Sequence, residues 1–278
     1  MTQSKINIKP LKISIIGSRG YPYVYSGYET LIKELSERLV QRGCEVTVYC
    51  HRNLFKEKPA NVNGIKLVYV PTIETKSLSQ LIHSFLSICH AAVSDVDVVF
   101  AVNAANGPFG LISKLFRKPT AINVDGLEWL RPKWKGLGAM YFKIAARLST
   151  ILFDQIINDS EEMRKVYLNM FKKESVVIAY GATIKKSVDP SLIQKWLITP
   201  KEYYLVVGRM IPDNNADIIV KGFLASNSTK KMVIVGDVFY KDSYADSLKA
   251  LKDDRLIFTG YVHDSDVLAA LYHHCYVY

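Results

Sequence analysis

Short β-rich runs alternate with amphipathic segments along the chain, and this alternation limits the possible folds more than any other feature. The first run, Lys12–Ile16, is followed by a glycine-containing loop, by apolar residues at helical spacing in Tyr28–Arg42, and by an alternating run in Glu45–Cys50. Such strand–helix–strand units place parallel strands side by side and cover them with helices. The sequence therefore predicts an α/β protein.

The alternation continues in two blocks separated by an irregular stretch. We expect a first domain in residues 1–183, a linker in residues 184–200, and the first part of a second domain in residues 201–278, whose sheet would stop after three or four strands. Further strands are expected at Ile65–Val70, Asp97–Val102, Thr120–Val124, Gln155–Ile157, Val176–Ile178, Tyr204–Val207, Met232–Val235, Leu256–Phe258 and Tyr276–Tyr278. Further helices are expected at Leu78–Val93, Gly110–Phe116, Gly138–Phe153, after a capping box of Asp159 and Glu162, at Asp217–Ala225 and at Asp264–Tyr272.

The cysteines and the apolar segments indicate a cytoplasmic protein. No two of the four cysteines form a Cys-x-x-Cys pair, which favours a reducing compartment and no metal site. The N-terminus lacks the apolar core of a signal peptide, and the least charged stretch, Ser77–Ser94, is too polar to span a membrane. We therefore expect a soluble or peripheral protein. The cysteines are Cys44, Cys50, Cys89 and Cys275.

Positive charge is concentrated in the first block. Residues 1–199 contain 27 Lys and Arg against 16 Asp and Glu, whereas residues 200–278 contain 9 against 10. The stretch Lys114–Arg147 has eight cations and two acids. A phosphorylated substrate, an anionic membrane or a merely solvated basic face would each explain it. We expect no nucleic-acid partner, because the sequence shows no nucleic-acid-binding motif.

The loop after the first strand, Gly17–Thr30, contains glycine and tyrosine and leads into a helix. It lacks the G-x-G-x-x-G pattern, and no acidic residue ends the second strand, which argues against a dinucleotide cofactor. Gly27 would let a phosphate or a sugar approach the backbone. Glycine is also common in ordinary strand-to-helix turns, so this loop alone decides nothing.

The loop after Thr120–Val124 combines carboxylates, tryptophans and cations at the end of one strand. Asp125 and Glu128 could accept hydrogen bonds from sugar hydroxyls, while Trp129 could cover an apolar sugar face. Alternatively, the two carboxylates cap the next helix and the tryptophans Trp129 and Trp134 pack in the core.

The second block offers two polar positions at strand ends. Arg209 follows a glycine after Tyr204–Val207, where a guanidinium beside a helix start could hold a diphosphate. Asp237 follows Gly236 and could meet a ribose or a base edge. The alternatives are an ordinary surface arginine and a plain turn.

Together these residues resemble the rhamnosyltransferase-like branch of the retaining family 4 glycosyltransferases. The resemblance covers most of the chain and rests on four strings at sensible spacing. They are IIGSRGYPYVYSGYETLIKELSERLVQRGCEVTVYCHR (Ile15–Arg52), NVDGLEW (Asn123–Trp129), IAYGA (Ile178–Ala182) and YLVVGRMIPDNN (Tyr204–Asn215).

This resemblance implies a GT-B fold, in which two Rossmann-like domains face a cleft. The second domain would bind a nucleotide-sugar donor, and the first would receive the acceptor. Donor contacts would come from Gly27, Arg209, Asn215, Gly236 and Asp237, with Asp125 and Arg209 as the catalytic residues. Acceptor contacts would come from Tyr28, Glu29, Glu128, Trp129 and Arg131.

Three positions depart from the family pattern. Ser26 stands before Gly27 where many members have a second glycine, and Asn215 stands where many have a phosphate-binding lysine. The family's glycine loop with two glutamates on the following helix would come after Tyr278. We therefore expect the donor domain of this chain to be incomplete.

The resemblance further implies a retaining transfer without metal or cofactor, in which the donor phosphate takes the acceptor proton and no protein nucleophile is needed. The expected function is transfer of a sugar, with rhamnose from dTDP-rhamnose as the leading candidate, to a glycan or polyprenyl-diphosphate-linked acceptor in bacterial surface polysaccharide (capsule) synthesis. The alternatives are a non-catalytic truncated binding protein and a nucleotide-sugar epimerase.

The basic, aromatic stretch Arg131–Phe153 would suit the surface of an anionic membrane, or would be a core helix with a solvated basic face.

Overall fold

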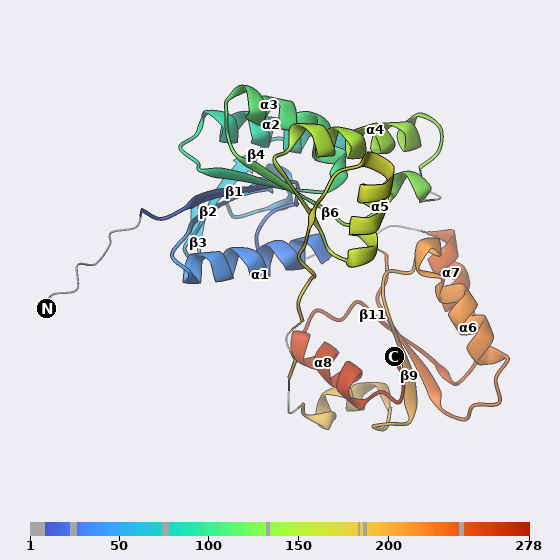
Figure 1. Ribbon diagram of the computed structural model, residues 1–278. Coiled ribbons are helices and arrows are strands. Elements are labelled where there is room, and N and C mark those ends of the chain that lie inside the picture. The colour runs from blue at the N-terminus through green and yellow to red at the C-terminus, as the bar shows by residue number, and fades with distance from the viewer. Residues whose placement is uncertain are drawn as a thin grey trace, which may run out of the picture. The chain divides into compact units, whose positions relative to one another are not determined.

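The computed structural model describes residues 9–22, 27–73, 78–131, 134–182, 184–185, 188–238 and 242–278 of the 278-residue chain. Its contacts divide the chain into two compact units, Met1–Gly181 and Ala182–Tyr278. Each unit has its own sheet with helices packed against it (Figure 1). The α/β class expected from the alternation is confirmed.

The first unit is built on an eight-stranded sheet in the order β3-β4-β2-β1-β5-β6-β7-β8. Neighbouring strands are parallel except for the edge pair of β3 and β4. The strands are β1 (Lys12–Ile16), β2 (Glu45–His51), β3 (Asn61–Val62), β4 (Ile65–Val70), β5 (Val98–Val102), β6 (Thr120–Val124), β7 (Gln155–Asn158) and β8 (Val176–Val177).

Helices cover both faces of this sheet, with α1 on one face and α2, α3 and α4 on the other (Figure 1). β1 is covered on both faces: Ile15 packs in one core with Ile32 of α1, and Ile16 packs in another with Ile88 of α2. The helices are α1 (Gly27–Gln41), α2 (Leu78–Val93), α3 (Gly110–Leu115), α4 (Leu137–Leu152) and α5 (Glu161–Phe171), with 3₁₀ turns η1 (Arg52–Leu54), η2 (Ala104–Phe109) and η3 (Glu128–Leu130).

Two histidines stack in the interior of this unit. The rings of His51, at the end of β2, and His83, on α2, have centroids 3.9 Å apart, and both side chains are buried. Burial lowers the pKa of His51 to about 4 and that of His83 to about 3, because the charged imidazolium would lose its hydration. Both rings are therefore neutral in the folded protein at pH 7.

We expect acid to weaken this fold well before the carboxylates titrate. As the pH falls below 6.5, the unfolded chain binds protons at the two histidines, whereas folded His51 does so only near 4. The free energy of unfolding therefore decreases over this interval, which urea unfolding at several pH values measures. His83→Phe should flatten the dependence, and the exposed His263→Gln should leave it unchanged. If the free energy of unfolding depended equally on pH in wild type, His83→Phe and His263→Gln, the two buried histidines would not be the cause of the acid sensitivity.

The second unit contains a three-stranded parallel sheet in the order β11-β10-β9. The last residues of the chain run beside β9, where the amide of Leu205 donates to the carbonyl of Val277 at 2.8 Å. The elements are η4 (Pro190–Trp196), β9 (Tyr203–Val207), η5 (Pro212–Asn214), α6 (Ala216–Leu224), β10 (Lys231–Val235), α7 (Ser243–Lys249), β11 (Leu256–Gly260) and α8 (Ser265–His274).

The structure corrects three local predictions. Residues 184–200 are not a free linker, because η4 lies within them and its Ile193 is fully buried in the core of the second unit. The N-cap of α5 is Ser160, whose hydroxyl accepts from the amide of Met163 at 3.4 Å, rather than Asp159. Helix α7 was not predicted.

Candidate active site

Asp125 lies at the carboxyl end of β6 and meets a side chain from the start of α1. The phenol of Tyr28 donates a hydrogen bond to the Asp125 carboxylate, although the two residues are 97 positions apart. The neighbouring strand supports this position, since Nδ2 of Asn158 donates to the carbonyl of Val124 at 3.2 Å. Asp125 is thus held by two elements that flank the carboxyl edge of the sheet.

The surroundings of Asp125 raise the pKa of its carboxyl group. Burial is the largest cause, and the negative charges of Asp159 and Glu128 act in the same direction. The hydrogen bond from Tyr28 and the charge of Arg131 oppose the shift. Burial also raises the pKa of the Tyr28 phenol well above its usual value, so this hydroxyl remains a donor. A carboxylate of this kind is common where a protein needs charge or proton transfer at a fixed point.

Sequence reasoning missed Tyr180 in this cluster. Its hydroxyl donates to Oδ1 of Asn123 at 3.0 Å, and burial together with the charges of Asp125 and Asp159 raises its pKa. Tyr180 follows β8 at the same edge of the sheet. The rule that parallel strands end at one edge would have indicated this position.

The rest of the Asp125 loop divides into polar and packed residues. Glu128 accepts from Nε1 of Trp134 at 3.1 Å, and Nε of Arg131 lies 3.0 Å from the Glu128 carboxylate. Trp129 packs against the hydrophobic core, edge-on to Phe171. Glu128 and Arg131 therefore belong with Asp125, whereas the Trp129 ring contacts the interior.

The loop after β1 approaches the same edge through α1. The buried carboxylate of Glu29 accepts from the amide of Arg19 at 3.2 Å, so this side chain holds the loop to the helix. Gly27 is the first residue of α1 and is exposed. Ser26 lies outside the described residues.

Removing the Tyr28 hydroxyl is expected to raise the pKa of Asp125 further. Tyr28→Phe keeps the ring but removes the hydrogen bond that favours the ionised carboxylate. In this variant Asp125 is ionised only at higher pH. Any activity that needs the charged carboxylate should therefore begin to fall, as the pH is lowered, at a higher pH than in wild type. NMR titration of labelled aspartate carboxyls measures the shift directly.

Tyr180→Phe is the matched control for Tyr28→Phe. It removes a phenol from the same cluster without removing a hydrogen bond to Asp125. An unchanged titration of Asp125 in Tyr28→Phe would show that the hydrogen bond does not tune the carboxylate.

In the second unit, Arg209 lies at the carboxyl end of β9 beside a pocket of about 410 Å³. The pocket is lined by Gly208, Asn214, Ile219 and Tyr278 among others. Arg209 is exposed, and within the described part of the chain its guanidinium makes no ion pair. An unpaired guanidinium in a pocket at a strand end can bind an anionic group.

The other residues of this unit that were predicted to bind the nucleotide-sugar donor have different surroundings from Arg209. Asn215 has a φ of 53° and precedes α6, while Nδ2 of Asn214 donates to the carbonyl of Arg209 at 2.8 Å and fixes the loop. Asp237 is paired with Lys249 at 2.6 Å. Burial opposes ionisation of Asp237, but the contacts with Lys249 and the amide of Val238 outweigh it and lower its pKa.

Gly236 is required where the loops after β9 and β10 meet. Its φ is +120°, and a Cβ there would lie 2.0 Å from the carbonyl oxygen of Gly208. Gly236→Ala is therefore expected to reduce the free energy of unfolding of this unit by about 3 kcal/mol. Gly222→Ala is the control, because a Cβ on this α6 residue meets nothing within 4 Å and should stabilise the helix slightly. Chemical unfolding compares them, and equal stability of the two variants would contradict the packing argument.

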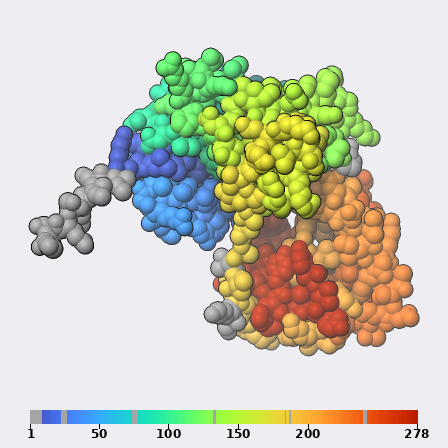
Figure 2. Space-filling view, viewed as in Figure 1, coloured from blue at the N-terminus to red at the C-terminus, as the bar shows by residue number. Residues whose placement is uncertain are grey.

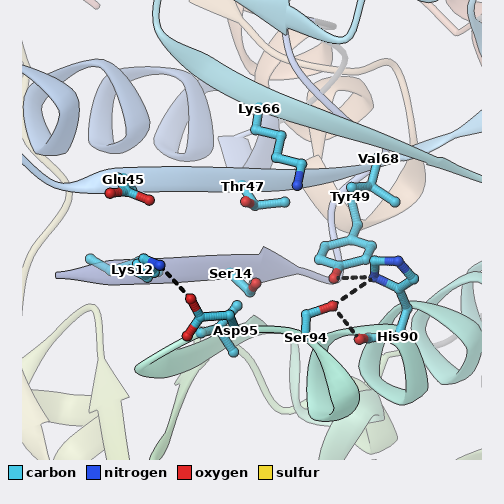
Figure 3. Close-up of a pocket in the computed structure, with 12 residues that line it drawn as sticks. Lys12, Ser14, Glu45, Thr47, Tyr49, Lys66, Val68, His90, Ser94 and Asp95 are labelled. Carbon is cyan, nitrogen blue, oxygen red and sulfur yellow. Dashed lines mark hydrogen bonds and ion pairs between the residues drawn. The ribbon is translucent and has the colours of Figure 1, made fainter. Parts of the chain in front are cut away.

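A separate polar pocket of about 240 Å³ lies on the sheet face near the amino ends of β1, β2 and β4 (Figure 3). Lys12 pairs there with Asp95, and the hydroxyl of Tyr49 lies 2.9 Å from Nδ1 of His90. This pocket is at the opposite ends of the strands from Asp125. Ligands of open α/β sheets bind at the carboxyl ends, so we assign the site to the Asp125 edge.

The described residues contain neither a candidate metal cluster nor a membrane-spanning helix. No cluster of three or more His, Cys, Asp or Glu side chains among them could hold a metal ion. No helix in the same residues combines the length and hydrophobicity needed to cross a bilayer.

Solved structures with a similar fold include a galactosyltransferase and proteins in complex with a nucleotide or a nucleotide sugar. Anabaena Alr3699/HepE in complex with UDP and glucose aligns with a TM-score of 0.69 and 17% identity over 94% of this chain and 72% of that chain. The apo lipopolysaccharide outer core galactosyltransferase WaaB aligns at 0.56 and 15% over 95% and 71%. Arabidopsis thaliana UGT89C1 complexed with UDP-L-rhamnose aligns at 0.52 and 13% over 91% and 70%. The chain has the GT-B fold, with two Rossmann-like domains.

The sequence comparisons are more limited. No curated protein sequence matches the chain. Residues 11–183, which include Tyr28, Asp125 and Tyr180, match the family model described as "Domain of unknown function (DUF1972)". The chain therefore belongs to the DUF1972 family.

Proposed function

We propose that this protein is a glycosyltransferase that moves a sugar from a nucleoside-diphosphate donor to an acceptor. The observation that carries the proposal is the partly buried Asp125 carboxylate at the carboxyl edge of the first sheet, held by the Tyr28 phenol in a GT-B fold. A sugar leaving a diphosphate develops positive charge at its anomeric carbon. A fixed carboxylate in a partly dry site stabilises that charge.

The second unit carries a candidate anion-binding residue of its own. The Arg209 guanidinium can neutralise the departing diphosphate, and the pocket beside it can hold the nucleoside. We propose a retaining transfer in which the donor phosphate oxygen accepts the proton of the acceptor hydroxyl. No protein nucleophile and no metal ion is part of this proposal.

The donor and acceptor are proposed more specifically as follows. The fold neighbours include complexes with UDP, UDP-glucose and UDP-L-rhamnose, which supports a nucleotide-sugar donor. We propose a hexose donor, with dTDP-rhamnose as the leading candidate, and a glycan or polyprenyl-diphosphate-linked acceptor in bacterial surface polysaccharide synthesis. Such an acceptor places the protein on the cytoplasmic face of the membrane.

Donor binding is tested first by isothermal titration with UDP-, dTDP- and GDP-sugars, followed by a transfer assay with the sugar that binds. Micromolar affinity for one nucleotide sugar supports the proposal and names the base. An acceptor requirement for turnover distinguishes a transferase from an epimerase. Binding without turnover would indicate a non-catalytic protein, and the absence of binding to all three classes would reject the proposal.

A further inference from the structure

We propose that the outward face of α3 and α4 in the first unit is a docking surface for an anionic membrane. The face consists of seven exposed apolar side chains with cations among them. In Figure 2 the residues of these two helices, coloured green to yellow-green, lie at the surface of the first unit. The apolar members are Leu111, Leu115, Phe116, Leu137, Met140, Ile144 and Ile151.

The face of α4 that points away from the core carries exposed apolar side chains beside the cations Lys143 and Arg147. Its inward residues Ala145, Ala146 and Ser149 are buried, whereas Leu137 is 79% exposed and Ile144 is 50% exposed. A helix on the surface of a soluble protein normally carries charged residues on its outer face. Large exposed apolar patches mark surfaces that contact another apolar phase.

Helix α3 extends this face. Leu115 at its end is 72% exposed and Phe116 is 52% exposed. The two helices are neighbours, since Nζ of Lys114 donates to the carbonyl of Ile151 at 3.5 Å. The exposed apolar residues of α3 and α4 thus lie on two helices that contact each other.

Charge selects the kind of partner. Residues 110–118 and 137–152 contain five Lys and Arg and no Asp or Glu. Arg117, Lys143 and Arg147 are exposed and make none of the ion pairs found in the described part of the chain. The nearby acids Glu161 and Glu162 of α5 pair with cations of their own helix.

Apolar side chains surrounded by unpaired cations fit a lipid bilayer with anionic headgroups. Lipid headgroups would neutralise the cations, and acyl chains would cover the leucine and isoleucine side chains. A groove of about 390 Å³ between α4 and α5, lined by Lys143, Ile144, Arg147, Met170 and Phe171, combines both chemistries at one point. A nucleic-acid backbone would meet the charges and leave the apolar residues exposed.

The structure also revises which residues of this region would contact lipid. Tyr141 is held by a hydrogen bond from its hydroxyl to the carbonyl of Ala105 at 2.8 Å, and Trp134 packs on Phe142. These rings are partly buried. The surface therefore relies on leucine, methionine, isoleucine and Phe116 rather than on Trp134, Tyr141 and Phe142, and it includes α3.

Vesicle flotation tests the inference with phosphatidylcholine vesicles that contain or lack phosphatidylglycerol, at low and high salt. We expect binding only to the anionic vesicles and weaker binding at high salt. Lys143→Ser with Arg147→Ser should reduce the affinity about fivefold per cation, following the energy of one basic residue at an anionic surface. Met140→Ser with Ile144→Ser should reduce it by about tenfold or more.

The control is Lys56→Ser with Lys58→Ser, which removes the same charge from an exposed loop of the same unit. An equal loss in this control, or no binding by the wild-type chain, would overturn the inference. A dimer, detected by light scattering, that dissociates in Ile144→Ser would also overturn the inference, since a second copy would then cover the face.

The role of this membrane surface in the reaction rests on the proposed lipid-linked acceptor. Vesicle binding requires no sugar transfer, so the two proposals fail independently.

Discussion

Asp125→Ala is expected to reduce sugar transfer by about 10²–10⁴-fold while leaving the fold intact. The carboxylate is fixed by the Tyr28 phenol at the end of β6, and burial already raises its pKa. A transition state with positive charge on the sugar gains from this carboxylate, whereas the bound donor gains little. The loss should therefore appear in kcat rather than in the affinity for the nucleotide sugar.

Two further variants sharpen this test. Asp125→Asn keeps the shape and the contact with Tyr28 but removes the charge, so it should be nearly as impaired as Asp125→Ala. Asp159→Asn removes a neighbouring charge that acts on Asp125 from a distance and should cost less than about tenfold. Thermal unfolding checks that each variant is folded. A wild-type rate in Asp125→Asn would remove Asp125 from the mechanism.

Arg209→Ala is expected to reduce kcat/KM for the nucleotide sugar by about 10²–10³-fold. The guanidinium is exposed in a pocket at the end of β9, with no ion-pair partner in the described residues. It is therefore free to form charge-assisted hydrogen bonds to a diphosphate, which strengthen as the leaving group gains charge. Isothermal titration and initial rates separate ground-state binding from transition-state stabilisation.

The conservative variant distinguishes charge from geometry. Arg209→Lys keeps the positive charge but loses the planar fork, so it should recover only part of the activity. Lys252→Ala removes an exposed cation elsewhere in the same unit and should have no effect on donor affinity. Equal losses in Lys252→Ala and Arg209→Ala would indicate a general effect of charge rather than a contact.

The strands were predictable from sequence because each is a short apolar run between turn residues. The predicted bounds of Lys12–Ile16, Ile65–Val70 and Thr120–Val124 are those of β1, β4 and β6. β1 and β6 are mostly buried, and in β4 Ile65, Leu67 and Val70 are buried while Lys66 is exposed, so each strand keeps enough apolar residues to be recognised. Helix caps and very short helices were not predictable in the same way, because neighbouring residues could serve equally well.

Capping and short helices illustrate that limit. Asp159 and Ser160 are adjacent and both can accept from a backbone amide, and only the geometry of the turn selects Ser160. Helix α7 is short and buries only Ala245 and Leu248, too few for a helical period to be visible. Tertiary packing determines which residue caps such a helix and whether such a short helix forms.

The candidate site combines a loop that the sequence indicates with contacts that it does not indicate. The sequence indicates the loop after β6 as a candidate binding site because polar residues are concentrated there at a strand end. The hydrogen bond from Tyr28 to Asp125 could not be read from the sequence, because it joins α1 to a loop 97 residues away. Tyr180 follows the strand expected at Val176–Ile178, but nothing in the sequence shows that its hydroxyl bonds to Asn123, which is 57 positions away.

The central position of β1 has a consequence for how the chain folds during synthesis. Its first partner, β2, follows within a few dozen residues, but the strand that covers its other edge, β5, begins only at Val98. Until then that edge of β1 leaves its backbone N–H and C=O groups without strand partners. This interval is the stage at which a ribosome-associated chaperone would have most to protect.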